Sequence, residues 1–225
     1  MDDVVVGFLL LLFFFSKKVP SPPTIVRQAD KEIIFDPRIN IEVPCVAKGD
    51  PPPKYTWTKD KRIYDPSAQN NRVAMKSNAG TLIITNPSAA DQGWYQCNAT
   101  NQYGTALSFA TRLRMAELSQ FPYSMRSKII RARRGDWVIL DCTPPTGVPD
   151  PYIYWSVVGD SDRDQFGTIT VSARVTQDYY GKLYILNVED EDEKDKRPYA
   201  CNAYSRRLLL LNQGELTVLE VEKGE

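Results

Sequence analysis

The chain has 225 residues, of which 28 are basic and 28 acidic, so it has no net charge and no global electrostatic footprint for nucleic acid. It contains no histidine, which removes the commonest general base and every Ser-His or Cys-His nucleophile. Its four cysteines form no Cys-x-x-Cys pair, the usual spacing of a zinc site or a redox pair. We therefore expect no catalytic residues, no metal, no cofactor and no nucleic-acid partner.

Residues 1–21 form a signal-peptide-like segment and lead-in. The apolar run Val4–Phe15 is too short to span a bilayer and has the length of a secretory signal core. The acidic start at Asp2-Asp3 and the lack of a clear cleavage site before Pro22-Pro23 depart from that pattern, so a mis-joined first exon stays open. No later stretch is long and apolar enough for a transmembrane helix.

Residues 22–115 are predicted to form a first domain of short strands. Apolar residues alternate with outward ones in Ile41–Cys45, which is the period of a half-buried strand, although Pro44 removes a ladder donor there. Tyr55-Thr56-Trp57 places two aromatic residues on one face of the next strand. Residues 81–85 and 93–101 supply two further strands.

Residues 119–225 repeat this order after a short linker at 116–118. Apolar residues alternate from Val138 to Cys142 and again from Ile153 to Val157. Because the linker lacks glycine and proline, free tumbling of the two domains is not expected.

Each half carries one set of four residues: a cysteine, a tryptophan about a dozen residues later, and a Tyr-x-Cys. The sets are Cys45, Trp57, Tyr95 and Cys97, and Cys142, Trp155, Tyr199 and Cys201. In an immunoglobulin-like β-sandwich, cysteines on strands B and F bridge the sheets, tryptophan packs on the bridge, and the tyrosine hydroxyl bonds the backbone at the E–F turn. The chain is therefore predicted to be all-β, with two tandem immunoglobulin-like β-sandwiches and one inter-sheet disulfide in each, made in an oxidising compartment.

Several segments resemble one family of immunoglobulin-domain proteins. Pro22–Ile25, Pro52–Trp57, Gly80–Ile84 and Gly93–Asn101 together are similar to the first immunoglobulin domain of the L1 family of neural cell adhesion molecules. The joint Met115–Leu118 and the segment Tyr199–Ala203 are most similar to its invertebrate branch.

The resemblance implies a non-enzymatic module that binds other cell-surface proteins, a second copy of itself among them. L1-family proteins are neuronal plasma-membrane proteins that act by homophilic and heterophilic adhesion in axon growth and guidance. Their first four immunoglobulin domains form an adhesive horseshoe, which is followed by further domains, a membrane span and a cytoplasmic tail. This sequence ends at Glu225, so we expect membrane attachment only through a missing C-terminal part, and an extracellular or secreted fragment.

Two other classes of protein stay open on the sequence. One is a soluble, hemolin-like immune recognition protein, and the other is the ligand-binding ectodomain of a receptor kinase. The domains that follow Glu225 would separate all three classes.

Asn98-Ala99-Thr100 is the N-glycosylation sequon of this chain, because Pro87 excludes Asn86-Pro87-Ser88. Cys97 is expected to face the core, and neighbouring residues of a strand face opposite sides. Asn98 is therefore expected to face solvent, where a glycan can be carried.

A basic cluster lies at the start of the second domain. It consists of Arg126, Lys128, Arg131, Arg133 and Arg134. One hypothesis is that this cluster binds a sulfated glycan or an acidic partner. The alternative is a solvated edge strand whose charges prevent sheet-to-sheet pairing.

Four consecutive leucines follow Arg206-Arg207 near the predicted F–G hairpin: Leu208, Leu209, Leu210 and Leu211. In a half-exposed strand at least one or two should face outward, which is typical of an interface. The alternative is packing on the linker or the first domain. The acidic run 189–195 lacks the spacing and turn glycine of a calcium-binding EF-hand, so we expect a hydrated turn there.

Overall fold

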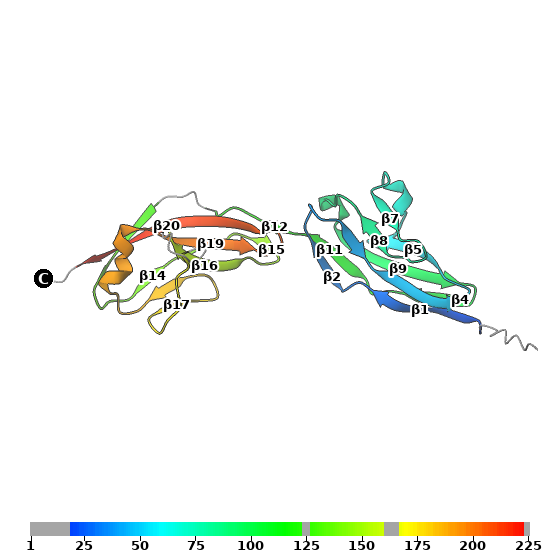
Figure 1. Ribbon diagram of the computed structural model, residues 1–225, viewed down its shortest axis with the longest axis horizontal. Helices are drawn as coiled ribbons and strands as arrows, with labels where there is room; N and C mark the ends of the chain where they lie inside the picture. The colour runs from blue at the N-terminus through cyan, green and yellow to red at the C-terminus, as the bar shows by residue number, and fades with distance from the viewer. Residues whose placement is uncertain (1–18, 123–126, 160–166, 223–225) are drawn as a thin grey trace, which may run out of the picture. The chain divides into compact units, whose positions relative to one another are not determined.

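The computed structural model describes residues 19–122, 127–159 and 167–222. Residues 1–18 of the signal-like segment, and Arg126, lie outside the described residues. The chain divides into two compact units, the first formed by Met1–Lys31, Glu42–Ile83 and Trp94–Thr111, and the second by Glu32–Ile41, Ile84–Gly93 and Arg112–Glu225. The prediction of an all-β, immunoglobulin-like fold is confirmed (Figure 1). The domain boundaries at 22–115 and 119–225 stay a prediction.

The strands of the first unit pair in several groups. Its strands are β1 (Ser21–Gln28), β4 (Cys45–Asp50), β5 (Lys54–Lys59), β6 (Arg62–Tyr64), β7 (Val73–Met75), β8 (Leu82–Ile84), β9 (Gly93–Asn101) and β10 (Gly104–Leu107), with a short 3-10 helix η1 (Pro66–Ala68). β10, β9, β5 and β6 pair in that order, and β1 pairs with β4. Strand β3 (Ile41–Val43) precedes β4, and Pro44, which has no N–H, separates the two.

The second unit holds the remaining strands. They are β2 (Glu32–Phe35), β11 (Thr111–Met115), β12 (Glu117–Leu118), β13 (Ser127–Arg133), β14 (Val138–Leu140), β15 (Gly147–Val148), β16 (Tyr152–Val157), β17 (Val175–Gln177), β18 (Leu183–Ile185), β19 (Tyr199–Ser205) and β20 (Leu210–Glu222), with 3-10 helices η2 (Ala89–Asp91) and η3 (Asp190–Lys196). One sheet has the order β13-β20-β19-β16 and another β14-β18-β17. β13 pairs with β20 in parallel over seven residues, from Ser127 with Leu216 to Arg133 with Glu222.

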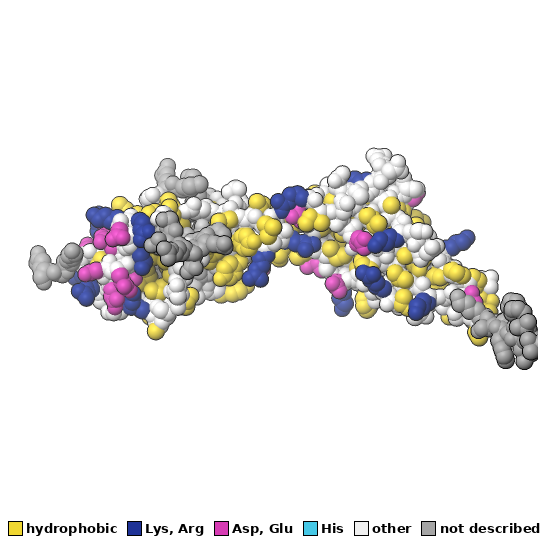
Figure 2. All heavy atoms as spheres, viewed as in Figure 1, with side chains coloured by type: hydrophobic (Ala, Val, Ile, Leu, Met, Phe, Trp, Pro, Cys, Tyr) yellow, Lys and Arg dark blue, Asp and Glu magenta, His cyan; other side chains and the backbone are white. Residues whose placement is uncertain are grey.

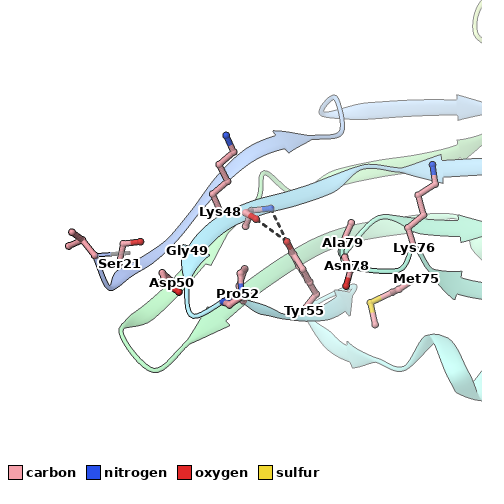
Figure 3. A pocket seen from close by; sticks show the side chains of 13 residues that line it. Ser21, Lys48, Gly49, Asp50, Pro52, Tyr55, Met75, Lys76, Asn78 and Ala79 are labelled. Carbon is pink, nitrogen blue, oxygen red and sulfur yellow. Dashed lines mark hydrogen bonds between the residues drawn. The ribbon is translucent and has the colours of Figure 1, made fainter. Parts of the chain in front are cut away.

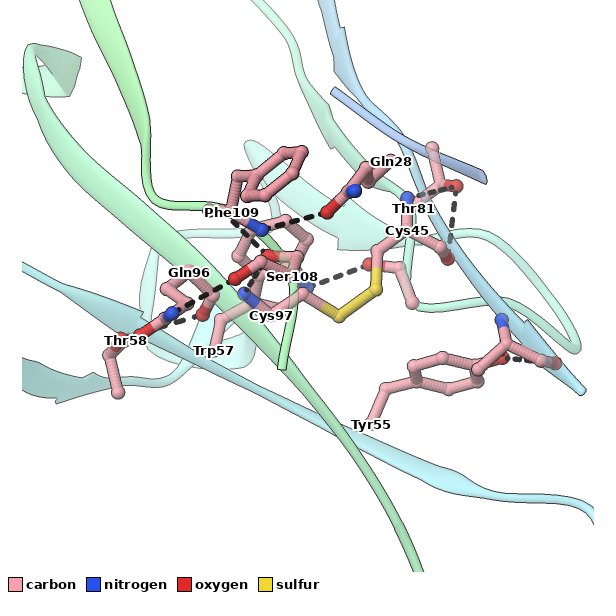
Figure 4. Close-up of a disulfide and its surroundings, with 12 residues drawn as sticks. Gln28, Cys45, Tyr55, Trp57, Thr58, Thr81, Gln96, Cys97, Ser108 and Phe109 are labelled. Atoms are coloured by element: carbon pink, nitrogen blue, oxygen red, sulfur yellow. Dashed lines mark hydrogen bonds between the residues drawn. A yellow bond between two sulfur atoms is a disulfide. The ribbon is translucent and has the colours of Figure 1, made fainter. Parts of the chain in front are cut away.

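The core of the first unit is built around the disulfide between Cys45 and Cys97, which lie 52 residues apart (Figure 4). Trp57 is 2% exposed, and its Nε1 donates a hydrogen bond to the carbonyl oxygen of Gly80 at 2.7 Å. A Cβ on Gly80 would lie 2.4 Å from Cδ1 of Tyr55 and 3.1 Å from Sγ of Cys97. Glycine is therefore required at position 80, because the ring of Tyr55 and the disulfide leave no room there for a side chain.

The same arrangement recurs in the second unit. Cys142 and Cys201 are bonded across 59 residues, and Nε1 of the buried Trp155 donates to the carbonyl oxygen of Gly181 at 2.7 Å. Gly181 has φ +95°, and a Cβ there would lie 2.9 Å from Cγ2 of Ile153. The two disulfides are confirmed, and the sequence pattern missed that each tryptophan needs a glycine partner.

The tyrosine corner of the second unit depends on a buried acid that the sequence did not single out. The hydroxyl of Tyr199 donates to the carbonyl oxygen of Asp192 at 2.7 Å. Oδ2 of Asp192 accepts from the backbone N–H of Glu189 at 2.8 Å and from Nη1 of Arg174 at 2.6 Å. Asp192 is only 2% exposed, so the expectation of a hydrated turn is wrong for this residue.

Asp91 has a matching role in the earlier turn. Its Oδ2 accepts from the backbone N–H of Ser88 at 2.7 Å, which closes a capping box at η2. Asp192 closes the equivalent box at η3 with Glu189. The Asp-x-Gly-x-Tyr pattern of the first turn is absent in the second because Asp192 lies farther from its tyrosine. The capping interaction itself is retained.

We expect Trp155→Ala to lower the free energy of unfolding by about 3–5 kcal/mol, because it leaves a cavity beside the disulfide and removes a buried hydrogen bond. Urea unfolding followed by circular dichroism would measure this loss. Trp137→Ala is the matched control, since Trp137 is 68% exposed in the same unit and should change stability by less than about 0.5 kcal/mol. Equal losses in both variants would contradict the assigned core position.

Burial raises the pKa of Tyr199 above its ordinary value of 10.0, and the neighbouring Asp192 raises it further. The unfolded chain then loses this proton at a lower pH than the folded chain. The contribution of Tyr199 to the free energy of unfolding is therefore complete below about pH 10 and falls as the pH rises above that value. We expect the melting temperature to fall above pH 10 in the wild type and to fall less in Tyr199→Phe.

At neutral pH, Tyr199→Phe should cost about 1 kcal/mol, the value of the lost hydrogen bond. Tyr152→Phe is the control, because Tyr152 is 58% exposed. An alkaline decline of the same size in the wild type and in Tyr199→Phe would show that another group causes it.

Candidate functional site

The described members of the basic cluster lie on or just after β13, at the edge of the four-stranded sheet. Nε of Arg131 lies 2.8 Å from Oε2 of Glu220, Nε of Arg133 lies 3.7 Å from Oε2 of Glu222, and Nη1 of Arg134 lies 4.0 Å from Oδ2 of Asp190. Lys128 is exposed on the same strand. The arginines therefore face carboxylates instead of forming an unbroken positive surface.

These ion pairs are exposed, so each contributes about 1 kcal/mol or less to stability. Figure 2 shows blue and magenta side chains intermingled at the part of the second unit that holds η3. The geometry favours the protected edge strand over a glycan site, and binding of a sulfated glycan stays a prediction.

The tyrosine–leucine face is a group of aromatic and apolar side chains on the second unit: Tyr152, Tyr154, Tyr204, Leu209 and Leu211. Tyr152 pairs with Tyr204, and Tyr204 with Leu211, so these three form one row across β16, β19 and β20. The ring centroids of Tyr152 and Tyr154 are 6.0 Å apart with an interplanar angle of 22°. Trp155 and Cys201, on the same two strands, are each 2% exposed and point into the core. Because neighbouring residues of a strand point to opposite sides, Tyr154 next to Trp155 lies on the face away from the core.

A cavity of 780 Å³ adjoins the tyrosine–leucine face. Among the described residues that line it, Arg206 is the charged one, and no carboxylate is present. Burial raises the pKa of Tyr154, and Tyr152 and Tyr204 raise it further, so its hydroxyl stays protonated at neutral pH. The lining of the cavity thus combines three tyrosine side chains with one guanidinium.

The four leucines divide between core and solvent. Leu208 is 7% exposed, whereas Leu209, Leu210 and Leu211 are 73%, 46% and 43% exposed. Leu209 has φ +53°, a conformation that favours glycine or asparagine and costs a leucine energy. A strained, exposed leucine at a hairpin tip is unfavourable for folding, so it points to a role in binding.

Sequence reasoning missed the three tyrosines of this face. Their signal was present, since Tyr152 and Tyr154 alternate with the inward residues Ile153 and Trp155. Tyr204 likewise follows the inward Ala203, which is 0% exposed. The strand pattern was used to identify the core residues, and the outward residues that alternate with them were not considered as a surface.

A second cavity, of 770 Å³, lies in the first unit beside β4 and β5 (Figure 3). The hydroxyl of Tyr55 accepts from the backbone N–H of Ala47 at 2.9 Å and donates to its carbonyl oxygen at 3.2 Å. Nζ of Lys76 lies 2.7 Å from Oε1 of Glu42. These polar groups of the cavity wall already have partners, so we assign the cavity no function.

Within residues 19–122, 127–159 and 167–222, no group of three or more acidic or cysteine side chains is arranged to hold a metal ion. No helix in these ranges is long and apolar enough to cross a membrane.

The family model of the immunoglobulin domain matches residues 22–101. Together with the two disulfides and the paired sheets, this match defines the chain as an immunoglobulin-domain protein.

Known proteins resemble the chain over most of its length. It is 36% identical over 193 residues to the neuronal cell adhesion molecule of Gallus gallus, a match that covers 83% of this chain and 14% of that protein. It is 36% identical over 205 residues to neuroglian of Drosophila melanogaster, covering 88% of this chain and 16% of that protein. The predicted similarity to the L1 family of neural cell adhesion molecules is confirmed.

Among solved structures, the crystal structure of the insect immune protein hemolin superposes with a TM-score of 0.74 at 27% identity. The superposition covers 92% of this chain and 51% of that chain. The chain thus spans about half of hemolin and, at 14% and 16%, a small part of the two adhesion molecules.

We expect Glu220→Gln with Glu222→Gln to raise the salt concentration at which the protein elutes from a heparin column, because the two substitutions free Arg131 and Arg133 from their carboxylates. Arg131→Gln with Arg133→Gln should lower it. Elution of both double variants at the wild-type salt concentration would remove the basic cluster as a site for sulfated glycans.

Proposed function

We propose that this chain is an extracellular adhesion and recognition module of a neuronal surface protein. It binds other cell-surface proteins, a second copy of itself among them, in axon growth and guidance. The chain is a binding module and not an enzyme. Its similarity to neuronal cell adhesion molecules supports this function, and the two disulfides suit the oxidising space outside the cell.

The tyrosine–leucine face is the observation that carries the proposal. Tyrosine and arginine are enriched among the residues that dominate protein interfaces, and Tyr152, Tyr204 and Arg206 lie together here. Tyrosine offers a large contact area at a low cost in side-chain entropy. The exposed Leu209 and Leu211 add apolar area that only a partner would remove from water.

A soluble immune recognition protein is the second candidate function. The hemolin superposition supports it, because it covers nearly the whole chain. Binding to bacterial cells, with no binding to neurons, would favour this candidate over neuronal adhesion.

Bead aggregation tests the adhesive function directly. Beads coated with the complete ectodomain that contains this chain should aggregate, and Leu209→Asn should slow the aggregation. Asparagine suits the positive φ of position 209, so this variant removes the apolar side chain without harming the fold. Leu209→Asn combined with Tyr204→Ser should weaken binding about tenfold or more, the effect of losing one interface hot spot.

Ile129→Thr is the matched control, because Ile129 is 55% exposed on β13 of the same sheet and lies outside the tyrosine–leucine face. If beads coated with the wild-type ectodomain stay dispersed, the hypothesis of self-adhesion is wrong. Binding of labelled ectodomain to neurons would then test for other partners. Unchanged binding by the double variant in both assays would show that the partner uses another surface.

A further inference from the structure

Asn98 lies in the middle of a solvent-facing sheet surface. Its neighbours Cys97 and Ala99 on β9 are 0% exposed, so Asn98 between them points away from the core. The residues opposite Asn98 are Thr56 on β5 and Leu107 on β10. The side chain is half-buried by these flanking strands, yet its face of the sheet is open.

The surface around Asn98 is rich in hydroxyl and amide groups, and Lys54, opposite Thr100, adds a charge at its end. On this face lie Thr56, Thr58, Gln96, Thr100 and Thr105. The hydroxyls of Thr100 and Thr105 are 2.9 Å apart. Such groups hydrogen-bond readily to sugar hydroxyls, because each can both donate and accept.

Leu107 is an exposed apolar residue of this surface, as is Ile63, which lies opposite Thr58. Leu107 is 58% exposed, although it lies directly opposite Asn98 in the β9–β10 pair. Side chains of directly opposed residues have Cβ atoms about 5 Å apart, which is within reach of the first sugar attached to Asn98. The apolar C–H face of a pyranose ring would cover the leucine at that distance.

We propose that Asn98 carries an N-linked glycan and that the first sugar of this glycan packs on Leu107. In the transfer, Nδ2 of Asn98 forms a bond to C1 of a lipid diphosphate oligosaccharide. The C1–O bond to the lipid diphosphate breaks, and the amide nitrogen loses one proton. Thr100 supplies the hydroxyl that completes the sequon. The donor and its transferase belong to the secretory pathway and act on the unfolded chain, so the strand position of Asn98 is no obstacle.

Mass spectrometry of the full chain, secreted from insect or mammalian cells, tests the modification. Treatment with peptide N-glycosidase should remove a glycan mass and convert Asn98 to aspartate. Thr100→Ala should abolish the glycan, whereas Thr100→Ser, which keeps the sequon, should retain it. Secreted wild-type protein with an unmodified Asn98 would overturn the proposal.

The contact with Leu107 has its own test. Enzymatic removal of the glycan should lower the melting temperature of the wild type by a few degrees and increase its light scattering, because Leu107 becomes exposed. The same treatment should change neither quantity in Leu107→Ser. Equal shifts in the wild type and Leu107→Ser, or no shift in either, would show that the glycan does not pack on this leucine.

Discussion

In each unit, a tryptophan, a glycine carbonyl and a disulfide meet at one point, and the rest of the structure depends on this contact. The indole rings of Trp57 and Trp155 are the largest rings of the two cores. Each is buried with its N–H group hydrogen-bonded, to the carbonyl oxygen of Gly80 or of Gly181. The disulfides link strands that are distant in sequence, which restricts the unfolded chain. With both inner faces fixed in this way, the outer faces of the sheets are free to differ between the units.

The outer faces have indeed diverged in chemistry. The sheet around Asn98 presents mainly hydroxyl and amide groups, whereas the sheet around Tyr204 presents aromatic rings and leucines. A glycan suits the first surface and excludes proteins from it, while the second surface has the composition of a protein interface. The proposed glycan and the proposed protein interface would thus lie on two sheets of the same kind of fold.

Much of the fold was predictable from the sequence, because the residues of the core obey strict rules of type and spacing. Cys97 and Trp155 each indicate a strand, and the alternation of apolar and polar residues around them shows which side of that strand is buried. The glycines at 80 and 181 were not predictable, since their role depends on a tryptophan more than twenty residues away. Asp192 escaped notice because five neighbouring acids resemble it, and only burial beside Arg174 distinguishes it. The tyrosine–leucine face depends on cross-strand register, which single-strand patterns do not contain.

The parallel pairing of β13 with β20 has a mechanical consequence. Tension along the chain enters this sheet at the beginning of β13, near Ser127, and leaves it at the end of β20, near Glu222. Because the two strands run in the same direction, such a pull slides them past each other and loads their hydrogen bonds together. An antiparallel hairpin pulled from its open end would instead lose its bonds one at a time. The direction of this one strand pair therefore decides that the sheet resists a pull along the chain by shear.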